Sequence, residues 1–78
     1  MKNKDNNYYY TIVRKNIKKY RIKANLTQQE LAEKTGFTYQ YIRDLESLAI
    51  VRCPRLDTLA IISEALNISI KNLFDGIE

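Results

Sequence analysis

The stretch TQQELAEKTGFTYQYIRDLE, residues 27–46, contains two helix starts separated by one sharp turn. Thr27 is placed to cap a helix that begins at about Gln28, because its hydroxyl can accept a hydrogen bond from the free amides there. Glu30, three residues later, can reach back to the amide of Thr27 and complete a capping box. The pattern therefore predicts a helix of about two turns.

The second half of the stretch predicts a turn and another short helix. Gly36 can adopt the left-handed conformation that ends a helix without a Cβ clash. Thr38 offers a second cap two residues later, and Ile42 and Leu45 form a narrow buried stripe together with Phe37. The other positions of this helix are expected to face outward: Tyr39, Gln40, Tyr41, Arg43 and Asp44.

This pair of helices has two interpretations. Capped helices separated by a glycine are common, so the pair is compatible with an ordinary helical hairpin whose outer face is solvated. The outward side chains favour a hairpin that reads DNA, because glutamine can bond adenine, arginine can bond guanine, aspartate can accept from cytosine and tyrosine can contact a thymine methyl. A solvated helix face would more usually carry Lys and Glu.

Three segments match a known family pattern in order: LTQQELAEKTG at 26–36, YIRDLE at 41–46 and PRLDTLAIISEALNISIKNLF at 54–74. Over roughly residues 12–76 the chain resembles the phage repressor and Cro-like, Xre-type helix-turn-helix family. The resemblance implies an all-α, five-helix lambda-repressor-like DNA-binding domain. Its second and third helices would form the helix-turn-helix.

The chain before this segment predicts one helix preceded by an arm. Val13, Ile17 and Tyr20 recur at four and three residues, which predicts a helix from about Thr11 to Ala24. The domain is therefore expected to span residues 11–78, after an N-terminal arm at 1–10. A disordered arm is the default expectation, although its lysines could also reach DNA and its tyrosines could dock on the domain or a partner.

After the segment, Pro54 marks the entry to a fourth helix with a wide apolar stripe: Leu56, Leu59, Ala60, Ile62 and Leu66. Asn67 is expected to end this helix. Ser69 then caps a short fifth helix, whose Leu73 and Phe74 either close the core or extend toward a partner.

Charge is unevenly distributed along the 78 residues. The formal net charge is +4, but residues 1–26 carry eight Lys or Arg and one Asp, net +7, whereas residues 27–78 carry five and eight, net −3. The expected first helix contributes Arg14, Lys15, Lys18, Lys19, Arg21 and Lys23. Such a run is usually a solvated face, but beside a helix-turn-helix it indicates a helix lying near the phosphate backbone.

Other features of the composition exclude several classes of protein. A single cysteine permits no internal disulfide, and the absence of histidine argues against a common metal cluster. No apolar run approaches the ~20 residues of a membrane span, and the N-terminus lacks a secretory signal. We therefore expect a soluble cytoplasmic protein with no cofactor, no metal, no membrane association and no enzyme activity.

The resemblance assigns roles to individual residues. It places Tyr39, Gln40, Arg43 and Asp44 at base edges, with Gln40 as the principal reader. It places near phosphates Thr27, Gln28, Thr38, Tyr41, Ser47, Arg52, Arg55 and Lys18; these contacts position a protein but do not specify sequence. Tyr41 has the equal alternative of packing against the first helix. Arg21 and Glu46 match a structural ion pair that orients the reading helix.

The chain departs from the family pattern in the loop SLAIVRC at 47–53, which lacks the usual glycine. Its apolar run at 48–51 would be unusual to leave in water, so there are three alternatives: a longer third helix, packing within the chain, or packing against a second subunit. We favour the second subunit. The dimer candidates are then Leu48, Ile50, Val51 and Phe74.

Two functions follow from these expectations. The first is a bacterial or phage transcriptional regulator, a repressor, which binds double-stranded DNA at a palindromic operator as a homodimer. The alternative is a protein-interaction module of the same fold, such as an antitoxin or adaptor, for which DNA contact is secondary.

Overall fold

The computed structural model describes residues 6–49 and 53–78, which contain helices and no strand. The elements are α1 (Asn6–Lys23), α2 (Gln28–Thr35), α3 (Tyr39–Glu46), α4 (Leu56–Ala65) and the 3-10 helix η1 (Ile70–Phe74). The prediction of an all-helical domain is confirmed, but the expected fifth α-helix is a 3-10 helix. Within the described residues no helix has the length and apolar character needed to cross a membrane.

Helix α1 begins at Asn6, five residues before the predicted start at Thr11. Residues 6–10 of the expected arm are therefore helical, while residues 1–5 lie outside the described part. One long-range contact is made in this extension, where the backbone amide of Glu78 donates to the Tyr8 hydroxyl at 3.4 Å, and the neighbouring Tyr8 and Tyr9 rings meet edge to face.

The caps of α2 and α3 form as the sequence predicts. The Thr27 hydroxyl accepts from the Glu30 amide at 3.0 Å, and the Glu30 carboxylate accepts from the Thr27 amide at 2.8 Å. Gly36 ends α2 with φ of 80°, and the Thr38 hydroxyl accepts from the Tyr41 amide at 3.1 Å to begin α3. The turn between the helices is thus fixed by hydrogen bonds at both of its ends.

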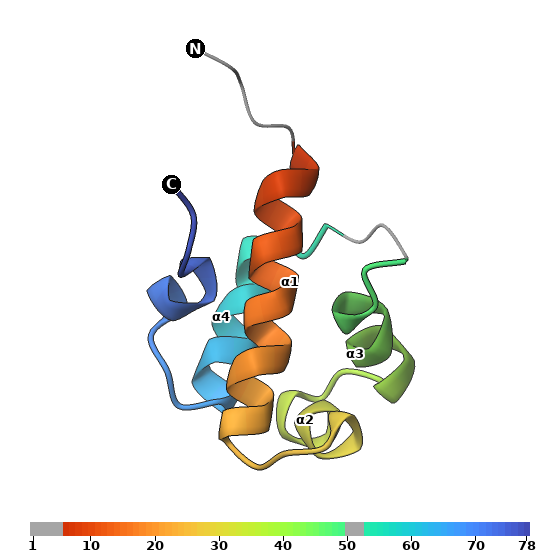
Figure 1. The fold of residues 1–78 in the computed structure, drawn as a ribbon. Helices are drawn as coiled ribbons and strands as arrows, with labels where there is room; N and C mark the ends of the chain where they lie inside the picture. The colour runs from red at the N-terminus through yellow and green to blue at the C-terminus, as the bar shows by residue number, and fades with distance from the viewer. Residues whose placement is uncertain (1–5, 50–52) are drawn as a thin grey trace.

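The helices surround one apolar core, with α1 between α3 on one side and α4 and η1 on the other (Figure 1). The buried core residues are Val13, Ile17, Leu31, Ala32, Ile42, Leu45, Leu59, Ile62, Leu66 and Leu73. Tyr20, predicted in the buried stripe of α1, is only half-buried. Because Ile42 and Leu45 are both fully buried, α3 has a fixed rotation about its own axis.

Helix α4 differs from its prediction on one face. Leu59, Ile62 and Leu66 are buried, but Leu56 is 69% exposed and Ala60 is also exposed, so the apolar stripe is wider than the core it covers. The helix ends close to the predicted stop, where Asn67 takes a left-handed conformation with φ of 57°.

Side chains bind the free backbone groups at both ends of the fifth element. Ser69 caps its start, and the Asn16 side chain donates at 2.9 Å to the carbonyls of both Leu73 and Asp75 at its end. Asn16 is buried on α1, so this contact fixes η1 against the long helix.

Candidate nucleic-acid interface

The first turn of α3 presents large polar and aromatic side chains outward. Tyr39 is 43% exposed, and Gln40 and Arg43 are also exposed. The Arg43 guanidinium lies over the Tyr39 ring, 5.6 Å from its centroid, which restricts both side chains by a cation–π contact. Three of the four predicted base-reading residues therefore lie together on one accessible surface.

The fourth, Asp44, does not face outward as predicted. It is only 7% exposed, and its Oδ1 atom accepts a hydrogen bond from Gln40 Nε2 at 2.9 Å. The prediction considered only the apolar stripe of α3 itself. It did not include the Gln40 side chain, one turn earlier on the same face, which contacts the carboxylate.

The C-terminal end of α3 is held by Arg14, which the sequence placed in a solvated or phosphate-facing run. Arg14 is instead 5% exposed. Its Nε donates to the Leu45 carbonyl at 2.8 Å, and its Nη2 donates to the carbonyls of Asp44, at 3.0 Å, and Ser47. The positive charge of Arg14 also interacts favourably with the negative C-terminal end of the helix dipole.

Sequence reasoning missed this role, although a signal was present. Arg14 precedes the core residue Ile17 by three positions, and Ile17 precedes Arg21 by four. Residues at these spacings share a helix face, so both arginines belong to the buried side of α1. Lys18, four residues after Arg14, is exposed.

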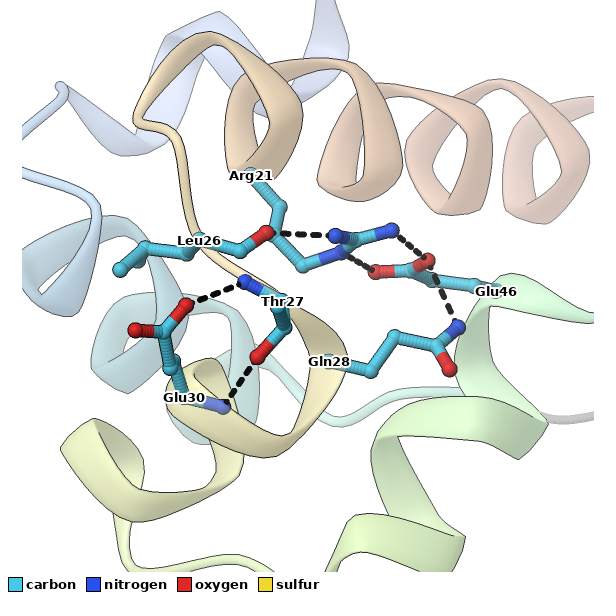
Figure 2. A network of polar contacts seen from close by, with 6 residues as sticks. All are labelled: Arg21, Leu26, Thr27, Gln28, Glu30 and Glu46. Atoms are coloured by element: carbon cyan, nitrogen blue, oxygen red, sulfur yellow. Dashed lines mark hydrogen bonds and ion pairs between the residues drawn. The ribbon is translucent and has the colours of Figure 1, made fainter.

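A second arginine ties three helices together at one carboxylate, as Figure 2 shows. Arg21 binds Glu46 through two hydrogen bonds, Nε to Oε2 at 2.6 Å and Nη2 to Oε1 at 2.9 Å, so the pair that the resemblance implied is formed. The remaining Nη1 donates to the Leu26 carbonyl at 2.6 Å. Gln28 Nε2 donates to the same Glu46 at 3.0 Å. Gln28 thus connects α2 to α3. The phosphate contact that the resemblance assigned to this residue stays a prediction.

The other predicted phosphate residues near the turn differ in accessibility. The hydroxyls of Thr27 and Thr38 are on exposed residues and, while accepting from helix amides, each retains an O–H that can donate. Tyr41 is half-buried, and its ring meets Phe37 edge to face at 5.2 Å. Ser47 is half-buried at the end of α3.

The segment after α3 lies partly outside the described residues, which include neither Arg52 nor the dimer candidates Ile50 and Val51. Helix α3 ends at Glu46, so it does not continue through this loop. Leu48 is 45% exposed. Arg55 is largely exposed and forms an exposed ion pair with Asp57 at 3.3 Å.

Apolar side chains also remain accessible on η1 and α4. Phe74, a predicted dimer residue, is 38% exposed. Leu56 and Ile61 on α4, which the sequence did not single out as surface residues, are 69% and 42% exposed.

Two short helices joined by a glycine turn, with the second held against the core and its first turn left open, define a helix-turn-helix DNA-binding domain. A helix-turn-helix family model matches residues 17–73. The chain belongs to this family, the lambda-repressor-like and Xre-type helix-turn-helix proteins. A search of the curated proteins found no match.

Proposed function

We propose that this protein is a sequence-specific transcriptional regulator, a repressor, that binds double-stranded DNA at a palindromic operator as a homodimer. The observation that carries the proposal is the exposed group of Tyr39 and Gln40, on the first turn of α3, with Arg43 one turn later. These side chains match the hydrogen-bonding and apolar groups that base pairs display in the major groove. Since the other end of α3 is immobilised, its first turn can enter the groove without reordering the domain.

Phosphate contacts would hold the domain in register on the duplex. Thr27 and Thr38 begin two helices whose first amides and positive dipole ends favour an anion. Lys18 adds an exposed cation on α1, one turn after Arg14. Arg55, already paired only to an exposed carboxylate, can exchange Asp57 for a phosphate at little cost.

The homodimer is supported by exposed apolar side chains in a domain of a size that gains stability from association. Leu48 and Phe74 are the described candidates for the contact. Sedimentation of a Leu48→Asp variant tests the first of them: a lower mass supports the contact, and an unchanged dimer mass removes Leu48 from it.

A binding-site selection with purified protein tests the main proposal. Random duplexes are enriched at moderate salt, because salt weakens the sequence-independent contribution of the phosphates. The proposal predicts an enriched motif with two related half-sites about one helical turn apart. Enrichment of no motif would reject it.

A second function is favoured by Leu56 and Ile61, two apolar side chains of α4 that are left accessible. In that case the domain is an antitoxin or adaptor that binds another protein through one of these side chains. The same selection separates the two functions, since a protein-interaction module needs no preferred DNA sequence. Under this alternative, Leu56→Asp abolishes partner binding, whereas the regulator should still select its motif.

A further inference from the structure

The contact between Gln40 and Asp44 determines which way the Gln40 amide faces. A carboxylate has acceptors and no donor, whereas a glutamine amide has donors on nitrogen and an acceptor on oxygen. The NH₂ group of Gln40 must therefore face Asp44, as the 2.9 Å contact from Nε2 to Oδ1 records. Asp44 is 7% exposed, so the bond is shielded from water on the carboxylate side.

This arrangement leaves a defined pair of groups on the exposed side of Gln40. One amide hydrogen is used by Asp44, which leaves one N–H donor and the Oε1 acceptor for a ligand. In the major groove, adenine presents one acceptor, N7, and one donor, the N6 amino group. Guanine presents two acceptors, N7 and O6. The donor and acceptor that remain on Gln40 therefore match those of adenine. With guanine, two acceptors would face each other, O6 of the base and Oε1 of Gln40.

We propose that Asp44 is a positioning residue that restricts Gln40 to adenine and makes it reject guanine. The inference rests on the proposed function, because it requires α3 to enter the major groove. It replaces the earlier assignment of Asp44 as a residue that itself contacts a base. The buried carboxylate acts through the amide that it orients.

The test begins by finding the base pair that Gln40 contacts. A binding-site selection is run on the wild type and on Gln40→Ala, and the contacted pair is the one whose preference disappears. Dissociation constants are then measured for two duplexes that differ only in having adenine or guanine at that position. The wild type should favour adenine by about 5- to 150-fold, the range expected for one bidentate contact.

Asp44→Asn is the main variant because it retains the size of the side chain. Asparagine can accept from Gln40 or donate to it, so both amide orientations become available. In the second orientation both Gln40 N–H groups face outward and can bond guanine. We expect the ratio of the two dissociation constants to fall to near one. Asp44→Ala removes the carboxylate that orients the Gln40 amide, so it should also lower the ratio of the two dissociation constants. Circular dichroism checks that each variant is folded.

The matched control is Glu33→Asn on α2. Gln29 and Glu33 have the same four-residue spacing as Gln40 and Asp44, and their side chains lie 3.5 Å apart on an exposed surface. The control loses the same negative charge, so it should tighten binding to both duplexes without changing their ratio. An unchanged ratio in Asp44→Asn, or a wild type that favours guanine, would overturn the proposal while leaving the regulator function intact. If the wild type selects no motif, both proposals fail.

Discussion

The two ends of α3 differ in what surrounds them, although the helix is only about 12 Å long. At its C-terminal end Leu45 is fully buried, and two arginines of α1 bind the last carbonyls and Glu46. At its N-terminal end Tyr39 and Gln40 are exposed. The first end supplies stability and orientation, and the second leaves side chains available to DNA.

Under the proposed function, this division would allow α3 to enter the major groove without a large conformational change. Arg14 and Arg21 are seven residues apart, so they project from the same face of α1 about two turns apart. Together they fix the position of α3 relative to the basic helix. Changes at the C-terminal end should therefore act on folding, whereas changes at the N-terminal end should act on binding.

The largest effect is expected from Glu46→Ala. The Glu46 side chain is 2% exposed and that of Arg21 is 10%, so the variant leaves a buried guanidinium without its carboxylate. Breaking such a pair costs about 3–5 kcal/mol, which should appear as a lower free energy of unfolding in urea denaturation. Glu64→Ala, an exposed site on α4, is the control and should change it by less than about 0.5 kcal/mol. Equal losses in the two variants would contradict the role of the pair.

Arg14→Met should have the next largest effect. It keeps much of the apolar stem but removes the donors to three carbonyls at the end of α3. We expect a loss of about 2–3 kcal/mol in the free energy of unfolding, because hydrogen bonds to a charged group are worth about 1.5–3 kcal/mol and do not add fully. Lys15→Met removes the same charge from an exposed neighbour and should have little effect on stability. If the lysine variant lost as much, net charge and not the carbonyl contacts would be responsible.

At the N-terminal end of α3, Gln40→Ala should act mainly on DNA binding, with a smaller loss of stability from the hydrogen bond that Asp44 no longer receives. It should cost about 1–3 kcal/mol in binding to the selected site and relax the preference at one base pair. Lys18→Ala should weaken binding to all sequences alike and reduce the salt dependence. Fluorescence anisotropy on specific and unrelated duplexes at several salt concentrations separates the two. Identical behaviour of the variants on every duplex would show that the roles are wrongly assigned.

The smallest effect concerns pH and a contact remote from α3. The Tyr20 hydroxyl donates to the Asp75 carboxylate, and this hydrogen bond, with desolvation and the negative charge of Asp75, raises the pKa of Tyr20 above its usual 10.0. The contact therefore stabilises the fold below pH 10.0 and is lost as the pH rises through the raised pKa. Urea denaturation should show wild type more stable than Tyr20→Phe at neutral pH, with a smaller difference above pH 10.0. A difference that did not change with pH would contradict this account.

The elements that the sequence predicts well are those determined by neighbours along the chain. The capping box at Thr27, the turn at Gly36, the cap at Thr38 and the stop at Asn67 are local hydrogen-bonding and backbone preferences. The buried stripe of α3 follows from periodicity in the same way. These features are sufficient to predict the helix-turn-helix and its exposed first turn.

What the sequence did not predict depends on contacts between distant segments. Arg14 reaches carbonyls about thirty residues away, and Asn16 binds η1 nearly sixty residues away. A charged residue gives no sign by itself of whether its partner is solvent, phosphate or backbone. Asp44 was misplaced for a different reason: the side chain that contacts its carboxylate is that of Gln40, one turn earlier on the same helix, and the prediction considered only the apolar stripe.

The division between the two ends of α3 is tested most directly by NMR of ¹⁵N-labelled protein titrated with the selected duplex. The account predicts that the side-chain amide signals of Gln40 shift strongly on binding. The Nε–H signals of Arg14 and Arg21, which are already hydrogen-bonded within the domain, should remain nearly unchanged. Large shifts of both arginine signals with an unchanged Gln40 amide would contradict it, because the C-terminal end of α3 would then be the part that responds to DNA.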